Sequence, residues 1–165
     1  MVSLESTALP TAELLKSRRE TIAIAESSAG GLIAASLLAV PGASSYFLGG
    51  AIIYTREARK IFLNLPMEKL QGIRPLSEEM AQIFAQTVKE DMGATWGIAE
   101  LGVAGPSGTP YSDEVGITVI AVAGPVTAST TVRTGDDNRE GNMHKFAKQA
   151  LSLCENTIGQ YDTNS

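Results

Sequence analysis

The sequence contains one cysteine and one histidine among 165 residues. A single cysteine cannot form an internal disulfide, which is consistent with a reducing compartment. Cys154 falls on the apolar stripe of an expected helix, so core packing is favoured over the alternative, a reactive thiol. With so few His and Cys ligands no metal site is expected. A Ser-His-Asp triad would rest on His144 alone, so serine chemistry would need a lysine or a phenol as its base.

Positive charge is also scarce, because 13 basic residues face 18 acidic ones and the net charge is -5. No basic run is longer than two residues, as in Arg18-Arg19 and Arg59-Lys60. Binding to duplex nucleic acid requires a clustered positive face, so no nucleic-acid partner is expected. A small nucleotide needs only one or two cations and a few backbone N–H groups, and that class of ligand stays open.

Long hydrophobic runs are missing as well. The longest apolar stretch, from Leu32 to Val40, is interrupted by Ser36 and is too short to span a bilayer. The N-terminus lacks the basic and apolar regions of a signal peptide. The segment from Glu26 to Gly31 matches neither the phosphate loop nor the dinucleotide-binding motif. No cofactor is expected. We therefore expect a cytoplasmic protein that does not bind membranes.

The residues that are present suit one α/β domain over residues 1–165. Apolar residues make up 44% of the chain, enough for a core without disulfide or metal. Thr7 and Pro10 indicate the start of a first helix that ends near Arg19. The other elements alternate as in a three-layer α/β/α sandwich. Strands are expected at 21–25, 50–55, 96–104, 116–123 and 130–133, and further helices at 32–40, 56–63, 77–93 and from about 136 onward.

Three unusual segments each follow an expected strand: 26–31, 54–60 and 105–109. The carboxyl ends of parallel strands meet at one edge of a sheet, and ligands bind there where the chain order reverses. We therefore expect the three segments to form one site.

The first segment, Glu26-Ser27-Ser28-Ala29-Gly30-Gly31, is a small-residue turn between a strand and a helix. A serine hydroxyl here could attack a carbonyl, while backbone N–H groups at the helix start hold the oxyanion. Alternatively, Ser27 or Ser28 caps the helix. The loop from Gly102 to Thr109 has a similar ambiguity, since it suits either an anion-binding nest or a chain-reversing turn.

The remaining segment places three cations close to a helix N-terminus. Thr55 suits the N-cap position, yet Arg56, Arg59 and Lys60 follow it, where the helix dipole disfavours positive charge. An anionic ligand would explain these cations. The alternative is a solvated surface on which Glu57 pairs with Lys60.

Together these segments resemble the CinA C-terminal family, also called competence/damage-inducible protein domains. The family's Ala-Glu-Ser-Cys/x-Thr-Gly-Gly turn is matched at five of seven positions by residues 25–31. Its other motifs follow in the same order over almost the whole chain. They are matched by Pro41-Gly42-Ala43-Ser44, Phe47, Gly49-Gly50, Tyr54-Thr55-Arg56-Glu57-Ala58-Arg59, the loop Gly102 to Gly108, and Gly135-Asp136 with Arg139.

This resemblance implies a mixed, mostly parallel five-stranded sheet with one antiparallel strand, and a homo-oligomer. Members include amidases that hydrolyse nicotinamide mononucleotide to nicotinate mononucleotide and ammonia with a serine–lysine dyad assisted by tyrosine. By position, Ser27 would be the nucleophile and Tyr54 its helper, with Lys60 as the available lysine. The residues expected to bind the nucleotide are Glu26, Ser28, Gly30, Gly31, Ser44, Arg59, Gly105, Pro106, Gly108, Thr109 and Arg139.

The chain departs from the family pattern inside the expected site. The dyad lysine aligns with Arg59, which stays protonated and cannot take a proton from serine. Lys60 is adjacent, but one residue turns a helical side chain by about 100°. The motif threonine is Ala29, and Asp113-Glu114 replaces a cation. Three hypotheses follow: an amidase of the serine type, a nucleotide-binding or interaction domain that lost its base, or a hydrolase of another amide or ester.

Overall fold

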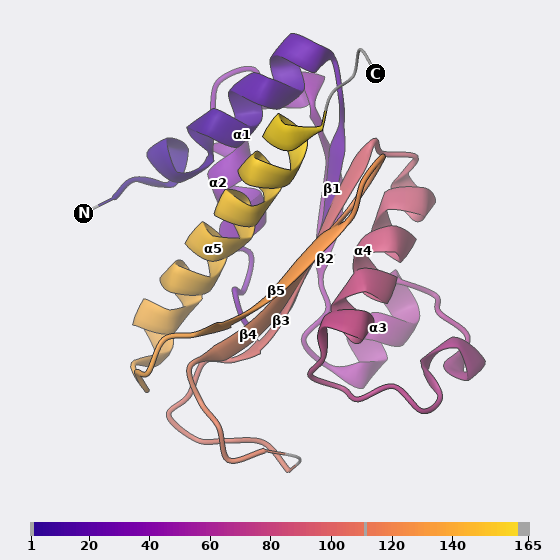
Figure 1. Cartoon of the computed structure of the whole chain (residues 1–165), viewed down its shortest axis with the longest axis vertical. Coiled ribbons are helices and arrows are strands. Elements are labelled where there is room, and N and C mark those ends of the chain that lie inside the picture. The colour runs from indigo at the N-terminus through magenta and orange to yellow at the C-terminus, as the bar shows by residue number, and fades with distance from the viewer. Residues whose placement is uncertain (1, 111, 162–165) are drawn as a thin grey trace.

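The computed structural model describes residues 2–110 and 112–161. Twelve elements follow one another along the chain (Figure 1). They are α1 (Leu4–Arg18), β1 (Ile22–Glu26), α2 (Leu32–Leu38), η1 (Ala43–Ser45), β2 (Phe47–Ile52), α3 (Arg56–Phe62), η2 (Met67–Leu70), α4 (Glu78–Met92), β3 (Trp96–Val103), β4 (Ile117–Ala123), β5 (Ala128–Arg133) and α5 (Arg139–Gln160).

The five strands form one sheet in the order β2-β1-β3-β4-β5. Strand β1 pairs in parallel with β2 and β3, whereas β4 runs antiparallel to both β3 and β5. Helices α1, α2 and α5 cover one face of the sheet, and α3 and α4 cover the other (Figure 1). The predicted three-layer α/β/α sandwich with a mixed, mostly parallel sheet is therefore confirmed.

The central strands are apolar because helices cover both of their faces. Strands β1 and β4 are buried along their whole length. One core lies under α1, α2 and α5 and includes Trp96 and Phe146, and a second core lies under α4 around Phe84. Cys154 is fully buried in the first core, and burial raises the pKa of its thiol, so the packing interpretation holds.

Several element boundaries differ from the sequence-based expectation: α2 ends at Leu38, β5 begins at Ala128 and α5 begins at Arg139, so Asp136 lies before the last helix. Two further differences have a clear physical reason. Helix α1 begins at Leu4, capped by the Ser3 hydroxyl, which accepts the Ser6 N–H at 3.0 Å, so Thr7 is not the cap and Pro10 lies inside the helix. Strand β2 covers 47–52 instead of 50–55. Its glycine pair belongs to the strand because a Cβ on Gly50 would lie 2.4 Å from the Ile24 carbonyl oxygen of β1. The pair permits close strand packing.

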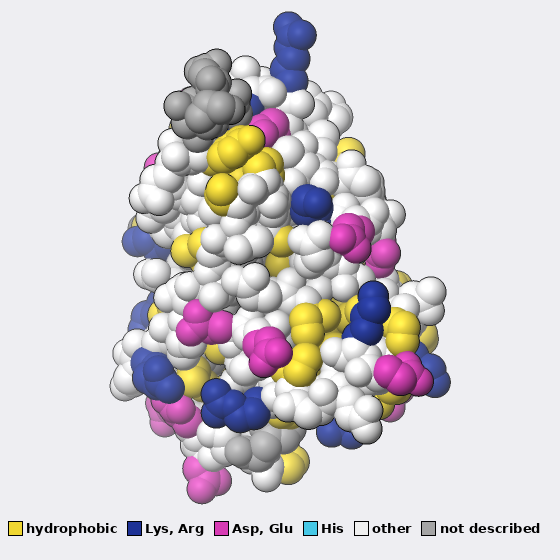
Figure 2. All heavy atoms as spheres, turned by 45° about the vertical axis from the view of Figure 1, so that its right-hand side comes forward, with side chains coloured by type: hydrophobic (Ala, Val, Ile, Leu, Met, Phe, Trp, Pro, Cys, Tyr) yellow, Lys and Arg dark blue, Asp and Glu magenta, His cyan; other side chains and the backbone are white. Residues whose placement is uncertain are grey.

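The surface that carries α3 and α4 mixes both signs of charge. Figure 2 shows Lys and Arg side chains interspersed with Asp and Glu over this face, with apolar side chains between them. Ile61 and Phe62 of α3 are exposed apolar side chains, at 71% and 60%. Over residues 2–110 and 112–161, no helix has both the length and the apolarity needed to cross a membrane.

Candidate functional site

A cavity of about 260 Å³ lies at the carboxyl edge of the parallel strands. The turn after β1 contributes Ser28, the segment after β2 contributes Tyr54, and the loop after β3 forms most of the wall. Arg139, the first residue of α5, completes the lining. The fold thus brings together side chains from all of the strand ends where ligand binding was expected.

The turn after β1 is organised by the buried carboxylate of Glu26. Its Oε1 accepts the N–H groups of Gly31 at 2.8 Å and Ile33 at 3.1 Å, and its Oε2 accepts that of Ala34 at 2.9 Å. Glu26 therefore stabilises the N-terminus of α2, where Gly31 is the N-cap residue with a φ of 101° and no side-chain cap bond. The interpretation of Ser27 or Ser28 as the helix cap is wrong.

A second buried carboxylate, Glu100 of β3, holds the same turn from the other side. Its Oε2 accepts the N–H groups of Ser27 at 3.1 Å and Ala29 at 2.9 Å. Its Oε1 accepts a short hydrogen bond from the Ser28 hydroxyl and one from the Thr118 hydroxyl at 2.8 Å. Glu100 is fully buried, so its charge is compensated by these four donors in place of water.

These two carboxylates change the expected chemistry of the turn. They take up five of the N–H groups that were expected to hold an oxyanion, so these five cannot do so. The groups concerned are the backbone N–H of Ser27, Ala29, Gly31, Ile33 and Ala34. Two buried negative charges beneath the turn also disfavour a further anion there.

The loop after β3 offers the donors that the turn does not. The N–H groups of Gly105, Ser107 and Gly108 make no hydrogen bond to any other described residue. Gly105 has a φ of 95°, and a Cβ there would lie 3.0 Å from the Asp137 carbonyl oxygen, so the loop packs closely on the segment before α5. This loop is the part of the cavity wall that suits an anion.

Arg139 lies between the loop and Tyr54. Its Nη1 donates to the Gly105 carbonyl oxygen at 2.6 Å, and its Nη2 donates to the Tyr54 hydroxyl oxygen at 3.2 Å. The guanidinium has five N–H groups, so three remain after these two bonds. The neighbouring Asn142 is fully buried and donates to the Ala104 carbonyl oxygen at 2.9 Å, which fastens α5 to the same loop.

Several expected site residues lie outside the cavity. Arg59 packs on the opposite face of the sheet, where its guanidinium carbon lies 5.4 Å from the Phe84 ring centroid and its Nε donates to the Ile53 carbonyl oxygen at 3.1 Å. Lys60 is exposed on α3 and is not part of the cavity lining. Within the described part of the chain no ion pair joins it to Glu57.

Ser44 lies at the wrong edge of the sheet. It precedes β2, so it is at the amino end of the parallel strands, whereas the cavity is at their carboxyl end. A six-residue strand separates the two edges by roughly 20 Å. The expectation that Ser44 binds the same nucleotide in this chain is therefore wrong. Ser44 is close to the other motifs in sequence, but it lies at the opposite edge of the sheet from the cavity.

The remaining expected residues form or support the wall. Pro106, Gly108 and Thr109 line the cavity with Gly105. Gly30 contacts α5, where an added Cβ would lie 2.7 Å from Met143 Cε. Ser27 is 5% exposed and is absent from the cavity lining, and its hydroxyl makes no hydrogen bond to a described residue.

Sequence reasoning missed Glu100, Thr118 and Asn142, all fully buried polar residues next to the cavity. A signal existed for Glu100, because it is the one charged residue in the strand Trp-Gly-Ile-Ala-Glu-Leu-Gly-Val. A lone charge in a buried strand needs partners, and the donors of the turn after β1 supply them.

Glu26 makes stability depend on pH. Burial raises the pKa of its carboxyl above the ordinary 4.5, outweighing the backbone hydrogen bonds from Ala34, Ile33 and Gly31, which lower it. The native state then binds more protons than the unfolded state above pH 4.5, so the free energy of unfolding falls as pH rises through this window. We expect Glu26→Gln to flatten that fall in urea titrations at several pH values. An unchanged slope would contradict the assignment.

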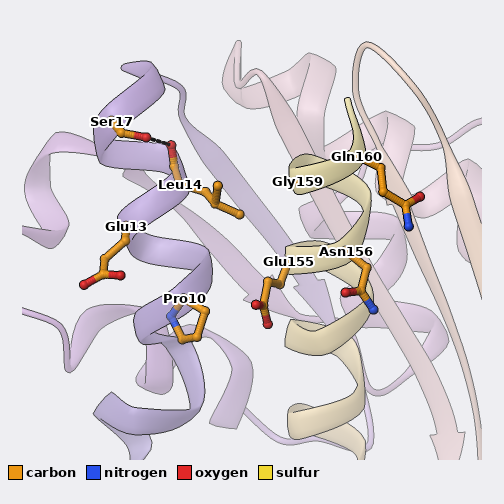
Figure 3. Close-up of a pocket in the computed structure, with 8 residues that line it drawn as sticks. All are labelled: Pro10, Glu13, Leu14, Ser17, Glu155, Asn156, Gly159 and Gln160. Carbon is orange, nitrogen blue, oxygen red and sulfur yellow. Dashed lines mark hydrogen bonds between the residues drawn. The ribbon is translucent and has the colours of Figure 1, made fainter. Parts of the chain in front are cut away.

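A second hollow, a groove of about 610 Å³, lies between α1 and the last turns of α5 (Figure 3). Glu13 and Glu155 are among its lining residues, and Leu14 points into the space between the helices. It contains none of the residues expected to act on a nucleotide. The carboxyl-edge cavity is therefore the candidate functional site.

Comparison with known proteins agrees with this architecture. The family model of the CinA C-terminal domain matches residues 4–158. A CinA-like protein of Prochlorococcus marinus is 38% identical over 144 residues, covering 87% of this chain and 34% of the relative. One of Anaeromyxobacter dehalogenans is 37% identical over 139 residues, covering 84% of this chain and 34% of the relative. The chain thus spans about a third of the length of these relatives.

Solved structures share the fold. A CinA superfamily protein from Klebsiella pneumoniae superimposes with a TM-score of 0.88 at 22% identity, over 97% of this chain and 100% of the other. A competence/damage-inducible protein from Agrobacterium tumefaciens gives a TM-score of 0.85 at 25% identity, over 95% and 96% of the two chains. With the motifs, the sheet topology and the family model in agreement, this chain belongs to the CinA C-terminal domain family.

Proposed function

We propose that this domain binds a small nucleotide in the carboxyl-edge cavity and hydrolyses its carboxamide. The resemblance to the CinA amidases makes nicotinamide mononucleotide the substrate to test. The observation that carries the proposal is that one cavity combines a serine hydroxyl, the Arg139 guanidinium and a loop with unbonded N–H groups. A nucleophile, an anion-binding cation and oxyanion donors are the parts that such a hydrolysis needs.

Binding would rest on the phosphate. Arg139 keeps three N–H groups after its bonds to Gly105 and Tyr54, and it is already held in place by those bonds. Arginine pairs with phosphate through two parallel hydrogen bonds, which gives both affinity and orientation. The Gly105–Gly108 loop can then face the carboxamide or a second phosphate oxygen.

Hydrolysis would use a serine of the turn after β1. The hydroxyl oxygen attacks the carboxamide carbon, the oxyanion is held by loop N–H groups, ammonia leaves, and water releases the acid. The resemblance assigns the attack to Ser27, with Tyr54 as helper. The dyad lysine has no equivalent among the described residues of the cavity wall, since Arg59 packs on Phe84 and Lys60 is on the surface of α3.

That missing lysine favours a second candidate function, a nucleotide-binding or interaction domain without turnover. A general base typically contributes about 10²–10⁴-fold to the rate. A chain that lost its base would keep the Arg139 cavity and release ammonia only slowly. Asp113 and Glu114 stand where the family pattern has a cation. A domain without turnover would no longer need that cation for catalysis.

One experiment separates these functions. Purified protein is titrated with nicotinamide mononucleotide by calorimetry, and ammonia is measured in parallel. We expect binding and ammonia release, with Arg139→Ala weakening binding about 10–100-fold because a charged hydrogen-bond pair is lost. Arg56→Ala is the matched control, since Arg56 is also the first residue of a helix but does not line the cavity.

Binding without ammonia supports the non-catalytic domain and ends the amidase proposal. Absence of binding at millimolar nucleotide, or equal losses in both arginine variants, would contradict the cavity as the nucleotide site.

A further inference from the structure

We infer that Ser28, rather than Ser27, is the nucleophile of this domain and that the buried Glu100 carboxylate takes its proton. The inference rests on the proposed hydrolase function of the cavity. It replaces the serine–lysine pair implied by the resemblance with a serine–glutamate pair, in which the serine comes from the turn after β1 and the glutamate from β3.

The two neighbouring serines differ in what surrounds their hydroxyl groups. Ser28 lines the cavity, and its hydroxyl donates to Glu100 Oε1 through a short hydrogen bond. Ser27 is not part of the lining, and its hydroxyl has no hydrogen-bond acceptor among the described residues. A serine oxygen becomes a nucleophile when a base within hydrogen-bond reach can remove its proton. Ser28 meets that condition, and Ser27 does not.

Glu100 is arranged as a base for this serine. The backbone N–H groups of Ser27 and Ala29 hold its Oε2, so the carboxylate cannot rotate away. Its Oε1 is left for the hydroxyl groups of Ser28 and Thr118. No lysine or arginine forms an ion pair with Glu100 in residues 2–110 and 112–161. The geometry therefore leaves Oε1 as the acceptor nearest to the Ser28 hydroxyl.

Room for the reaction comes from Gly102. A Cβ at this position would lie 2.5 Å from Ser28 Oγ, so any larger residue would displace the hydroxyl. The loop that follows Gly102 carries the unbonded N–H groups of Gly105, Ser107 and Gly108. The nucleophile and the candidate oxyanion donors thus face one cavity, while the N–H groups of the turn serve the base.

The Ser28 proton moves to Glu100 Oε1 as Oγ forms a bond to the carboxamide carbon, and the carbonyl π electrons move to the oxygen. Collapse of the oxyanion breaks the carbon–nitrogen bond, and Glu100 returns the proton to the leaving nitrogen, which departs as ammonia. Water then adds to the ester carbon, giving its proton to Glu100, and Ser28 Oγ leaves with that proton.

A serine-directed probe tests the pair without any nucleotide. A fluorophosphonate forms a bond between serine oxygen and phosphorus and expels fluoride, and intact-mass spectrometry follows the rate on the full chain. Fragment spectra distinguish an adduct on Ser28 from one on Ser27. We expect the adduct on Ser28, abolished in Ser28→Ala and retained in Ser27→Ala. Ser17→Ala, exposed on α1, is the remote control.

Glu100→Gln is expected to slow the labelling of Ser28 by about 10²–10⁴-fold, which is the usual contribution of a general base to the rate. Thermal unfolding shows whether this variant is folded, and the comparison of the two serine variants decides the question if it is not. An adduct on Ser27, or no adduct in the folded wild type, overturns the inference. Labelling of Ser28 without ammonia release from nicotinamide mononucleotide would instead contradict only the proposed amidase function.

Discussion

Replacing Glu100 by alanine is expected to lower the free energy of unfolding by about 3–5 kcal/mol, the usual cost of breaking a buried polar network. The substitution removes one fully buried carboxylate and leaves three donors without an acceptor, the N–H groups of Ser27 and Ala29 and the Ser28 hydroxyl. The Thr118 hydroxyl can still donate to the Leu101 carbonyl oxygen at 3.1 Å. Each buried donor left unsatisfied costs about 1–3 kcal/mol, although local relaxation recovers part of the sum. The turn after β1 is thus expected to loosen first.

Urea unfolding followed by circular dichroism measures this loss. Glu114→Ala is the matched control, because Glu114 is exposed and forms an ion pair with Arg133 at 2.6 Å. A surface pair of this kind contributes at most about 1 kcal/mol. Equal losses for the two variants would mean that water satisfies the donors around position 100 and that Glu100 does not hold the turn.

The two buried carboxylates also explain where an anionic ligand can bind. A small-residue turn leading into a helix is normally an attractive anion site, because its N–H groups and the helix dipole point outward. Here Glu26 and Glu100 occupy those N–H groups from inside the protein. An external phosphate must use other donors, and Arg139 with the Gly105–Gly108 loop are the donors that face the cavity.

The fold could be predicted from local sequence patterns, namely apolar runs for strands and capping residues for helices. Strands β1 and β4 are short apolar runs, and helix α4 begins after Ser77, whose hydroxyl accepts the Met80 N–H at 3.2 Å. Strand β2 was misplaced by three residues at its start, because glycine normally weakens a strand. Gly50 is tolerated there since the neighbouring strand approaches too closely for any side chain.

The site was only partly predictable for the same reason. The convergence of strand ends follows from topology, which a sequence can indicate. The partner of Ser28 lies 72 residues away on β3, and no spacing rule connects the two. Adjacent serines in a turn look equivalent in sequence, yet only contacts decide which one faces the cavity. Arg59 likewise matched a motif position but packs on the far face of the sheet.

Gly97→Ala is expected to lower the free energy of unfolding by about 3 kcal/mol, at the upper end of the usual cost of overpacking a core. Gly97 lies on β3 beneath α4, where a Cβ would be 2.3 Å from the Ala85 carbonyl oxygen and 2.9 Å from Lys89 Cβ. The first contact is with backbone, so the helix itself must move away from the sheet. That shift reaches β3 three residues before Glu100.

Gly159→Ala provides the opposite control. Gly159 is near the end of α5 beside the groove of Figure 3, and a Cβ there would meet only Leu14 Cδ1 at 3.9 Å. Alanine should stabilise this helix by up to about 1 kcal/mol, because glycine loses more backbone entropy on folding. Opposite signs for the two variants in urea unfolding are expected. A neutral Gly97→Ala would contradict the close packing of α4 on β3 at Gly97. In that case the strand that carries Glu100 would be positioned by β1 and β4 and not by α4.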